Sequence, residues 1–265
     1  MQMTLKHMDV ARERAAEMLS AGDRTLSRFK AIWQTARGQE DRLGILAARS
    51  QLLDYLAASH VLSDTQCFSA ARDALLEQAG AFVERFQPPN EILLIELSLA
   101  LTAKRRPAAR ALAKAVLSGT GTGSQTSESF QAHSLSALLD LDYPIAQNSA
   151  AALARACEDK AFDKLTCAQG LLWATAVQQL ASGDGAAAES AVQELVQQHI
   201  SRTDRELAKL KRGGASPFAP FDMLDLPVAA LLTLIEAAGH LSQPLSEAAW
   251  SCGYALGLKP ARAEG

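Results

Sequence analysis

Apolar side chains recur at every third and fourth position along most of this chain, which is the spacing of one face of an α-helix. The clearest case spans residues 171–200, where one apolar helix pattern stops at Gly183-Asp184-Gly185 and a second pattern follows. Such an apolar stripe is stable only when other helices cover it. This segment therefore predicts a helix hairpin that packs inside a larger helical protein.

The same arrangement recurs along the sequence and predicts an N-terminal helical region over 4–37, bent near 20–23, followed by five helix pairs. The predicted pairs are 41–60 with 64–86, 91–104 with 107–118, 128–140 with 144–158, 164–181 with 186–211, and 224–238 with 245–257. Ser63 and Gln66 have the spacing of a capping box at the start of one of these helices. We expect about 11 or 12 helices and no sheet.

One central apolar residue from the second helix of each pair recurs at a spacing of about 40 residues, once an insertion near 203–222 is set aside. These residues are Leu76, Leu112, Leu153, Val192 and Cys252. Any stack of antiparallel helices with short connections gives similar intervals. The predicted fold is therefore all-α, either as a solenoid-like stack of antiparallel helix hairpins or as an irregular helical bundle.

The chain, residues 1–265, is expected to form a single all-helical domain, with a possible subdivision at the Gly/Ser/Thr-rich segment 118–127. Within that segment, the run GTGTG at 119–123 could be mistaken for a phosphate-binding loop. It follows a predicted helix instead of a strand and lacks the Lys-Ser/Thr pair of such loops. We interpret it as a flexible linker.

Charge and hydropathy restrict the classes of partner. The chain carries 26 basic and 29 acidic residues, for a net charge of −3, and the two signs are interspersed. This pattern does not indicate a nucleic-acid-binding surface. The N-terminus lacks the apolar segment of a secretion signal, and no stretch reaches the roughly 18 apolar residues of a membrane span. We therefore expect a cytoplasmic protein without a membrane partner.

Candidate chemistry is sparse. The four cysteines, Cys67, Cys157, Cys167 and Cys252, lack the spacing of a zinc site, and we expect them to be reduced thiols. The histidines form no HExxH pair, and His199 lies on an apolar stripe, where a hydrogen-bonded core histidine is expected. No GxSxG motif marks a nucleophile. The sequence thus predicts no catalytic residue, no cofactor and no metal, and favours a protein that is not an enzyme.

The best candidate for a partner contact lies at 209–222. A basic helix end at Lys209, Lys211 and Arg212 leads into a Gly/Pro-rich loop that carries Phe218, Phe221 and Asp222. Aromatic residues beside charges are typical anchors of protein interfaces. The alternative is that both phenylalanines fold back over the seam between the fourth and fifth helix pairs, and the basic residues simply complement the helix dipole.

The segment 224–241 reads LDLPVAALLTLIEAAGHL, an aspartate–proline helix start and a long apolar helix closed by Gly-His-Leu. Together with the alanine-rich helix pairs and the chain length, it resembles the all-helical immunity proteins of bacterial polymorphic-toxin systems, particularly the family catalogued as number forty-nine. That resemblance implies a cytosolic protein that neutralises a cognate bacterial toxin domain by binding it, without catalytic residues.

A second similarity concerns the segment 180–189, LASGDGAAAE, which resembles the inter-helix turn of tetratricopeptide-like hairpins. The signature tryptophan and tyrosine positions of those repeats are missing. This similarity implies an alternative function, a helical-repeat adaptor or chaperone that binds a peptide in a concave groove.

Overall fold

The computed structural model describes residues 5–20, 23–119, 125–214, 219–241, 249 and 252–254. It is 80% helical, with twelve α-helices and no strand in the described part, which confirms the all-α prediction. The helices are α1 (Met8–Ser20), α2 (Asp23–Thr35), α3 (Arg42–Val61), α4 (Thr65–Leu76), α5 (Ala79–Phe86), α6 (Asn90–Thr102), α7 (Arg106–Leu117), α8 (Ser127–Leu139), α9 (Tyr143–Glu158), α10 (Lys164–Ala181), α11 (Gly185–Lys211) and α12 (Leu226–Ala237). Two short 3₁₀ turns, η1 (Gln39–Asp41) and η2 (Pro220–Met223), precede α3 and α12.

Four of the predicted helix pairs are joined by turns of the same length, at 62–64, 103–105, 140–142 and 182–184. The middle residue of each turn has a left-handed backbone, as in Leu141 with φ 59° and Gly183 with φ 85°. Its amide and the next one bond back to the end of the preceding helix, for example Leu141 N to Leu138 O and Asp142 N to Ala137 O. A repeated local geometry therefore builds the hairpins.

In three of these turns the last residue is an aspartate that caps the next helix. Asp64 accepts from the amide of Cys67 at 2.9 Å, and Asp184 accepts from the amide of Ala187 at 3.0 Å. Asp142 caps α9 in the same way. The predicted capping box at Ser63 is therefore wrong, because Ser63 adopts the left-handed conformation with φ 58° and the cap is the residue after it.

Two predicted helices differ from the sequence interpretation. The expected helix over 64–86 is divided at residues 77–78 into α4 and α5. The partner expected for the fifth pair, 245–257, lies almost wholly outside the described residues. Of that segment the structure describes Ala249 and residues 252–254, and Cys252 and Tyr254 are fully buried.

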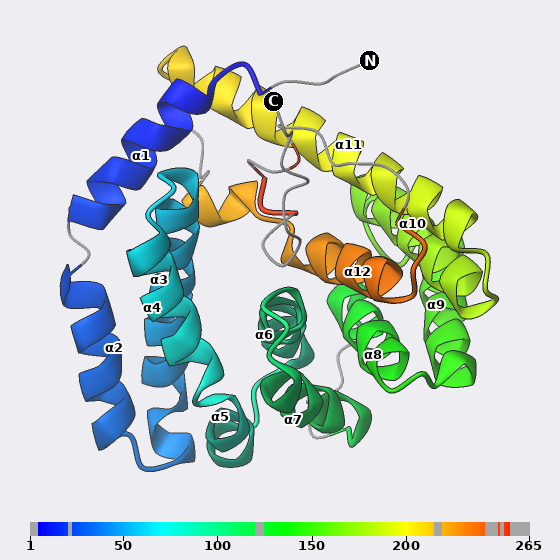
Figure 1. The fold of residues 1–265 in the computed structure, drawn as a ribbon, viewed down its shortest axis with the longest axis horizontal. Coiled ribbons are helices and arrows are strands. Elements are labelled where there is room, and N and C mark those ends of the chain that lie inside the picture. The colour runs from blue at the N-terminus through cyan, green and yellow to red at the C-terminus, as the bar shows by residue number, and fades with distance from the viewer. Residues whose placement is uncertain are drawn as a thin grey trace.

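The hairpins form a curved array with the last described helix on its inner side (Figure 1). Neighbouring helices from α6 to α11 pack against each other in chain order, while α12 packs against α6, α8 and α11. Eight of the twelve residues of α12 are buried, so its surface is apolar nearly all round, as expected for an internal helix. The fold thus has repeated hairpins but fills the inside of the array with its own chain.

The N-terminal helix α1 connects the two ends of the array. It packs against α3 and α11. The amide of Lys6 donates to Asp204 Oδ1 at 2.8 Å, and Lys211 Nζ lies 2.9 Å from Asp9 Oδ2. The helices therefore close into a ring around α12 (Figure 1).

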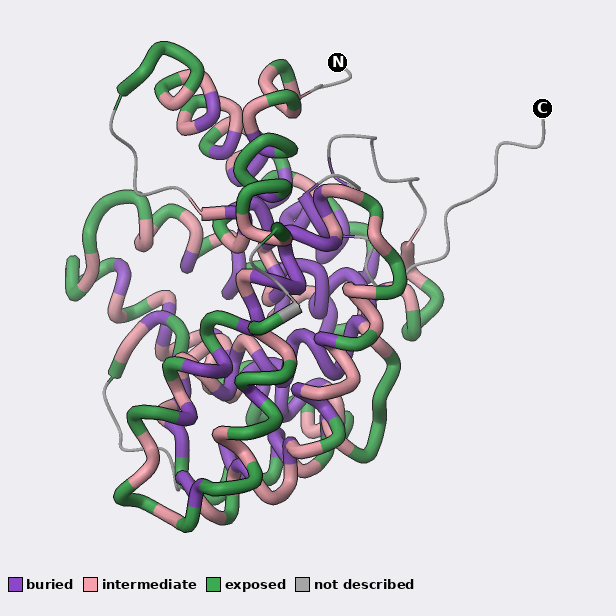
Figure 2. Tube along the Cα trace, turned by 90° about the vertical axis from the view of Figure 1, so that its left-hand side faces the viewer, coloured by how far each residue is buried: buried purple, intermediate pink, exposed green. Residues whose placement is uncertain are grey.

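One continuous core extends through the ring and includes residues from both sides of 118–127. Figure 2 shows buried positions gathered through the middle of the molecule and exposed positions on turns and outer faces. No described helix is both long enough and apolar enough to cross a bilayer.

An ion pair lies inside this core. The Arg49 guanidinium of α3 binds both carboxylate oxygens of Glu96 on α6, and the two residues are 1% and 0% exposed. Arg49 also donates to Leu75 O at 3.0 Å and lies over the ring of Phe82, 4.0 Å from its centre. Burial raises the pKa of Glu96, while the adjacent guanidinium acts in the opposite direction. The pair joins α3, α4, α5 and α6.

Leucines chosen from the helical stripes lie in the core as predicted: Leu112, Leu153 and Leu231 are 0% exposed and Leu195 is 4% exposed. We expect truncation of any one to Ala to lower the free energy of unfolding by about 2–5 kcal/mol, because each leaves a cavity. Urea unfolding of the four single variants measures this. Losses below about 1 kcal/mol at all four would contradict the assignment of the buried faces.

Candidate functional site

The predicted contact segment 209–222 is only partly free for a partner. Lys211 pairs with Asp9, and Lys209 lies against Glu206 of the same helix, so both cations already have carboxylate neighbours. Arg212 is exposed and donates to Ala208 O. The structure thus uses part of the basic helix end to close the ring.

The described aromatic residue of that segment is also used inside the fold. Phe221 is half-buried and packs against the main core, as the fold-back alternative expects. Asp222 Oδ2 accepts from the amide of Ala219 at 2.6 Å and so holds the turn η2. Phe218 lies outside the described residues. The segment stays a predicted contact, with Phe221 assigned to packing.

His199 is the hydrogen-bonded core histidine that the sequence indicates. It is 8% exposed, with Nε2 at 2.9 Å from Met223 O and Nδ1 at 3.6 Å from Asp225 Oδ2. Cys252 lies in the same buried region, where burial raises the pKa of its thiol to about 12. Because Nε2 faces a backbone carbonyl and the thiol stays protonated, this cluster does not supply an activated nucleophile.

Another surface has the features of a binding site. Where the hairpin turns meet the C-terminal end of α12, they enclose a groove of about 740 Å³, which is within the range of ligand sites. We call it the turn-edge groove. Leu101, Leu138, Leu180 and Leu234 are among its apolar lining residues, and Lys104, Arg106, Arg110, Leu141, Tyr143, Glu236 and His240 are among the others.

The repeated turn geometry places these side chains. Lys104 and Leu141 are the left-handed residues of their turns, and Gly183 occupies the equivalent position in the third turn of the groove. Leu141 and Tyr143 are 68% and 40% exposed, although both are large and apolar or aromatic. Both residues line the same groove, so exposed apolar and aromatic side chains are gathered there, as is typical of interaction sites.

Basic residues border the apolar lining. Arg106, Arg110 and Lys114 are exposed and occupy one face of α7, a helix without any acidic residue. Like charges one turn apart repel each other, and no ion pair relieves any of the three within the described part of the chain. We call these three residues the α7 ridge. Three positive charges without an ion-pair partner among the described residues favour contact with an acidic partner surface.

At one side of the groove, the backbone of Gly185 lies very close to the side chain of His240. A Cβ at Gly185, the first residue of α11, would lie 1.9 Å from His240 Cγ. Gly183 in the preceding turn has a φ of +85°, a backbone conformation that residues with a side chain rarely adopt. On the other side, Lys104 Nζ reaches Glu236 Oε2 at 3.3 Å and ties the second hairpin to α12.

No group of three or more potential metal ligands occurs among the described residues. No family model matches the chain, and comparisons with curated proteins and with solved structures found no match. The sequence interpretation missed the groove, because its residues come from three turns and a helix end that meet only in the folded protein. The signals that could have suggested it are the Lys104-Arg105-Arg106 run and the acid-free sequence of α7.

We expect Gly185→Ala to lower the free energy of unfolding by about 1–3 kcal/mol, because the new methyl group overlaps His240. Alanine otherwise favours helix by about 0.5–1 kcal/mol over glycine. In a His240→Gly background, which also removes the His240 Cβ that would lie 2.2 Å from the new methyl group, the same change should therefore become neutral or stabilising. Urea unfolding of the two single variants and the double variant measures this reversal, and an equal loss in both backgrounds would contradict the close approach.

Proposed function

We propose that this chain is a protein-binding scaffold that acts as a cytosolic immunity protein and neutralises a bacterial toxin domain by direct contact. The observation that carries the proposal is the α7 ridge beside the exposed apolar lining of the turn-edge groove. Apolar anchors give binding energy, and a complementary charge steers the partner and fixes its orientation. The resemblance of the sequence to toxin immunity proteins supports the choice of partner.

In this proposal the toxin presents an acidic segment with an apolar anchor. The anchor enters the groove between Leu141 and Tyr143, and the acidic groups meet Arg106 and Arg110 on its border. Neither role requires catalysis, a cofactor or a metal. Inhibition follows from occupying the toxin surface.

The alternative is a helical-repeat adaptor or chaperone that binds a peptide. The equal turns of four hairpins favour it, because repeat proteins share such local geometry. Adaptors of this kind hold peptides on the inner, concave side of the array, which α12 occupies here. An adaptor built on this chain would therefore use the turn-edge groove as well.

Charge reversal on the border of the groove tests the contact. We expect Arg106→Glu with Arg110→Glu to weaken binding to the cognate toxin domain at least about tenfold, or about 1.4 kcal/mol. Cells that express the toxin should lose protection to the same variant. Binding by the unaltered protein should also weaken as salt is raised, since exposed charges are screened.

Arg155→Glu with Lys164→Glu is the matched control. Both residues are exposed, and they lie in the last turn of α9 and the first turn of α10, away from the groove residues Tyr143 and Leu180. Full protection by the groove variant would contradict the proposed contact. Loss of protection in Phe218→Ser with Phe221→Ser, at an unchanged melting temperature, would instead place the contact at 209–222.

A further inference from the structure

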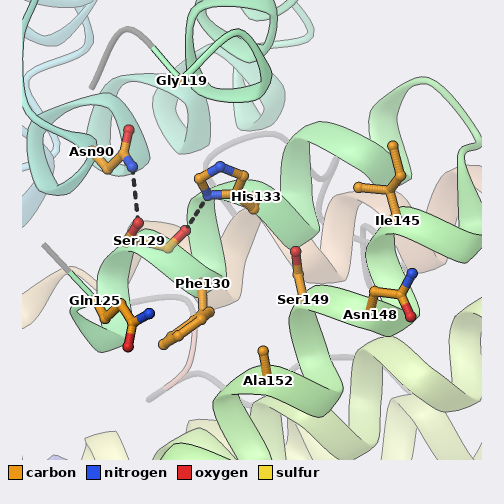
Figure 3. Close-up of a pocket in the computed structure, with 10 residues that line it drawn as sticks. All are labelled: Asn90, Gly119, Gln125, Ser129, Phe130, His133, Ile145, Asn148, Ser149 and Ala152. Atoms are coloured by element: carbon orange, nitrogen blue, oxygen red, sulfur yellow. Dashed lines mark hydrogen bonds between the residues drawn. The ribbon is translucent and has the colours of Figure 1, made fainter. Parts of the chain in front are cut away.

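A second cleft lies away from the turn-edge groove. It has a volume of about 610 Å³ and is formed by the start of α6, the end of α7, and the facing sides of α8 and α9 (Figure 3). Ten of the described residues line it, and none of these is Asp, Glu, Lys or Arg. Because a charged ligand would enter without a counter-charge and lose hydration, the lining favours a neutral molecule.

The inner end of the cleft is held rigid by side-chain hydrogen bonds. Asn90 Nδ2 donates to Ser129 Oγ at 2.8 Å, and Thr126 Oγ1 donates to Glu91 Oε1 at 2.9 Å. Both bonds join the first turn of α6 to the start of α8. A site held in this way binds without paying to order its own groups.

The same bond leaves an acceptor without a partner. Asn90 is 5% exposed, and its Oδ1 atom is buried with no hydrogen-bond partner among the described residues. A buried carbonyl oxygen in this state is unfavourable, because its bond to water has been lost and not replaced. Since less than 1 Å² of this oxygen is exposed, a ligand in the cleft does not reach it, and the part that Asn90 plays is to hold the start of α6 against Ser129.

His133 supplies an acceptor on the lining of the cleft. Its Nδ1 lies 2.8 Å from Ser129 O, and since a carbonyl oxygen can only accept, Nδ1 carries the proton. The neutral ring then has its lone pair on Nε2. Figure 3 shows the His133 ring and Asn90 at the same end of the cleft, on the side of Gly119.

The rest of the lining matches a polyol. Gln125, Asn148 and Ser149 can each donate and accept, as hydroxyl groups do, and Phe130 provides an aromatic surface for C–H groups. We propose that this cleft binds a neutral saccharide of monosaccharide size, with His133 Nε2 accepting a hydrogen bond from a ligand hydroxyl. The site is separate from the turn-edge groove and does not depend on the function proposed for it.

Titration with D-glucose, N-acetylglucosamine and myo-inositol, followed by saturation-transfer NMR and calorimetry, tests this site on the full chain. We expect saturable, millimolar binding of at least one of the three, and weaker binding of glucose 6-phosphate. His133→Phe keeps a ring of similar size but removes the acceptor, and should weaken binding at least about tenfold. Gln147→Leu, an exposed change on α9 beside the cleft, should leave the affinity unchanged.

Failure of all three neutral probes to saturate at tens of millimolar would overturn the proposal, as would tighter binding of glucose 6-phosphate. Unchanged affinity in His133→Phe at an unchanged melting temperature would also overturn it. Arg106→Glu with Arg110→Glu should bind the saccharide normally, so this site and the proposed protein contact are tested separately.

Discussion

The buried ion pair between Arg49 and Glu96 is the constraint on which the arrangement of helices depends. Transferring two charges into an apolar core is costly, and their mutual attraction and further hydrogen bonds offset that cost. Both carboxylate oxygens of Glu96 bind one guanidinium, which also bonds to Leu75 O and lies over Phe82, while its Nη1 atom is buried without a hydrogen-bond partner among the described residues. These contacts hold together one residue each from α3, α4, α5 and α6. The pair therefore fixes how the N-terminal helices join the hairpin array.

The helices on either side of this ion pair complete the ring. The hairpins after α6 add one turn of equal geometry after another, so their turns gather along one edge and form the turn-edge groove. Toward the N-terminus, α1 packs against α11, and the ion pair between Lys211 and Asp9 closes the ring there. The inside is filled by α12, which leaves the edge and outer surfaces, and not the concave side, for a partner. The proposed protein contact and saccharide cleft lie on such surfaces.

The sequence predicted the features that depend on residues close together along the chain, namely the helices and their buried faces. Helix spacing located the hairpins, and leucines such as Leu153 and Leu231 lie in the core as their stripes required. The division between α4 and α5 and the cap at Asp64 were missed, because several polar residues could end or start a helix there. Glu96 and Arg49 each interrupt an apolar helix, but only tertiary packing shows that they meet. The groove was missed for the same reason, as its parts are far apart along the chain.

A double-mutant cycle on Arg49 and Glu96 tests the central claim most directly. Arg49→Met and Glu96→Leu each leave one buried charge without its partner, and each should lower the free energy of unfolding by about 3–5 kcal/mol. Removing both charges together should cost clearly less than the sum, with a coupling of about 0.5–3 kcal/mol measured by urea unfolding. Additive losses, or single losses below about 1 kcal/mol, would contradict the account that this pair fixes the helix arrangement.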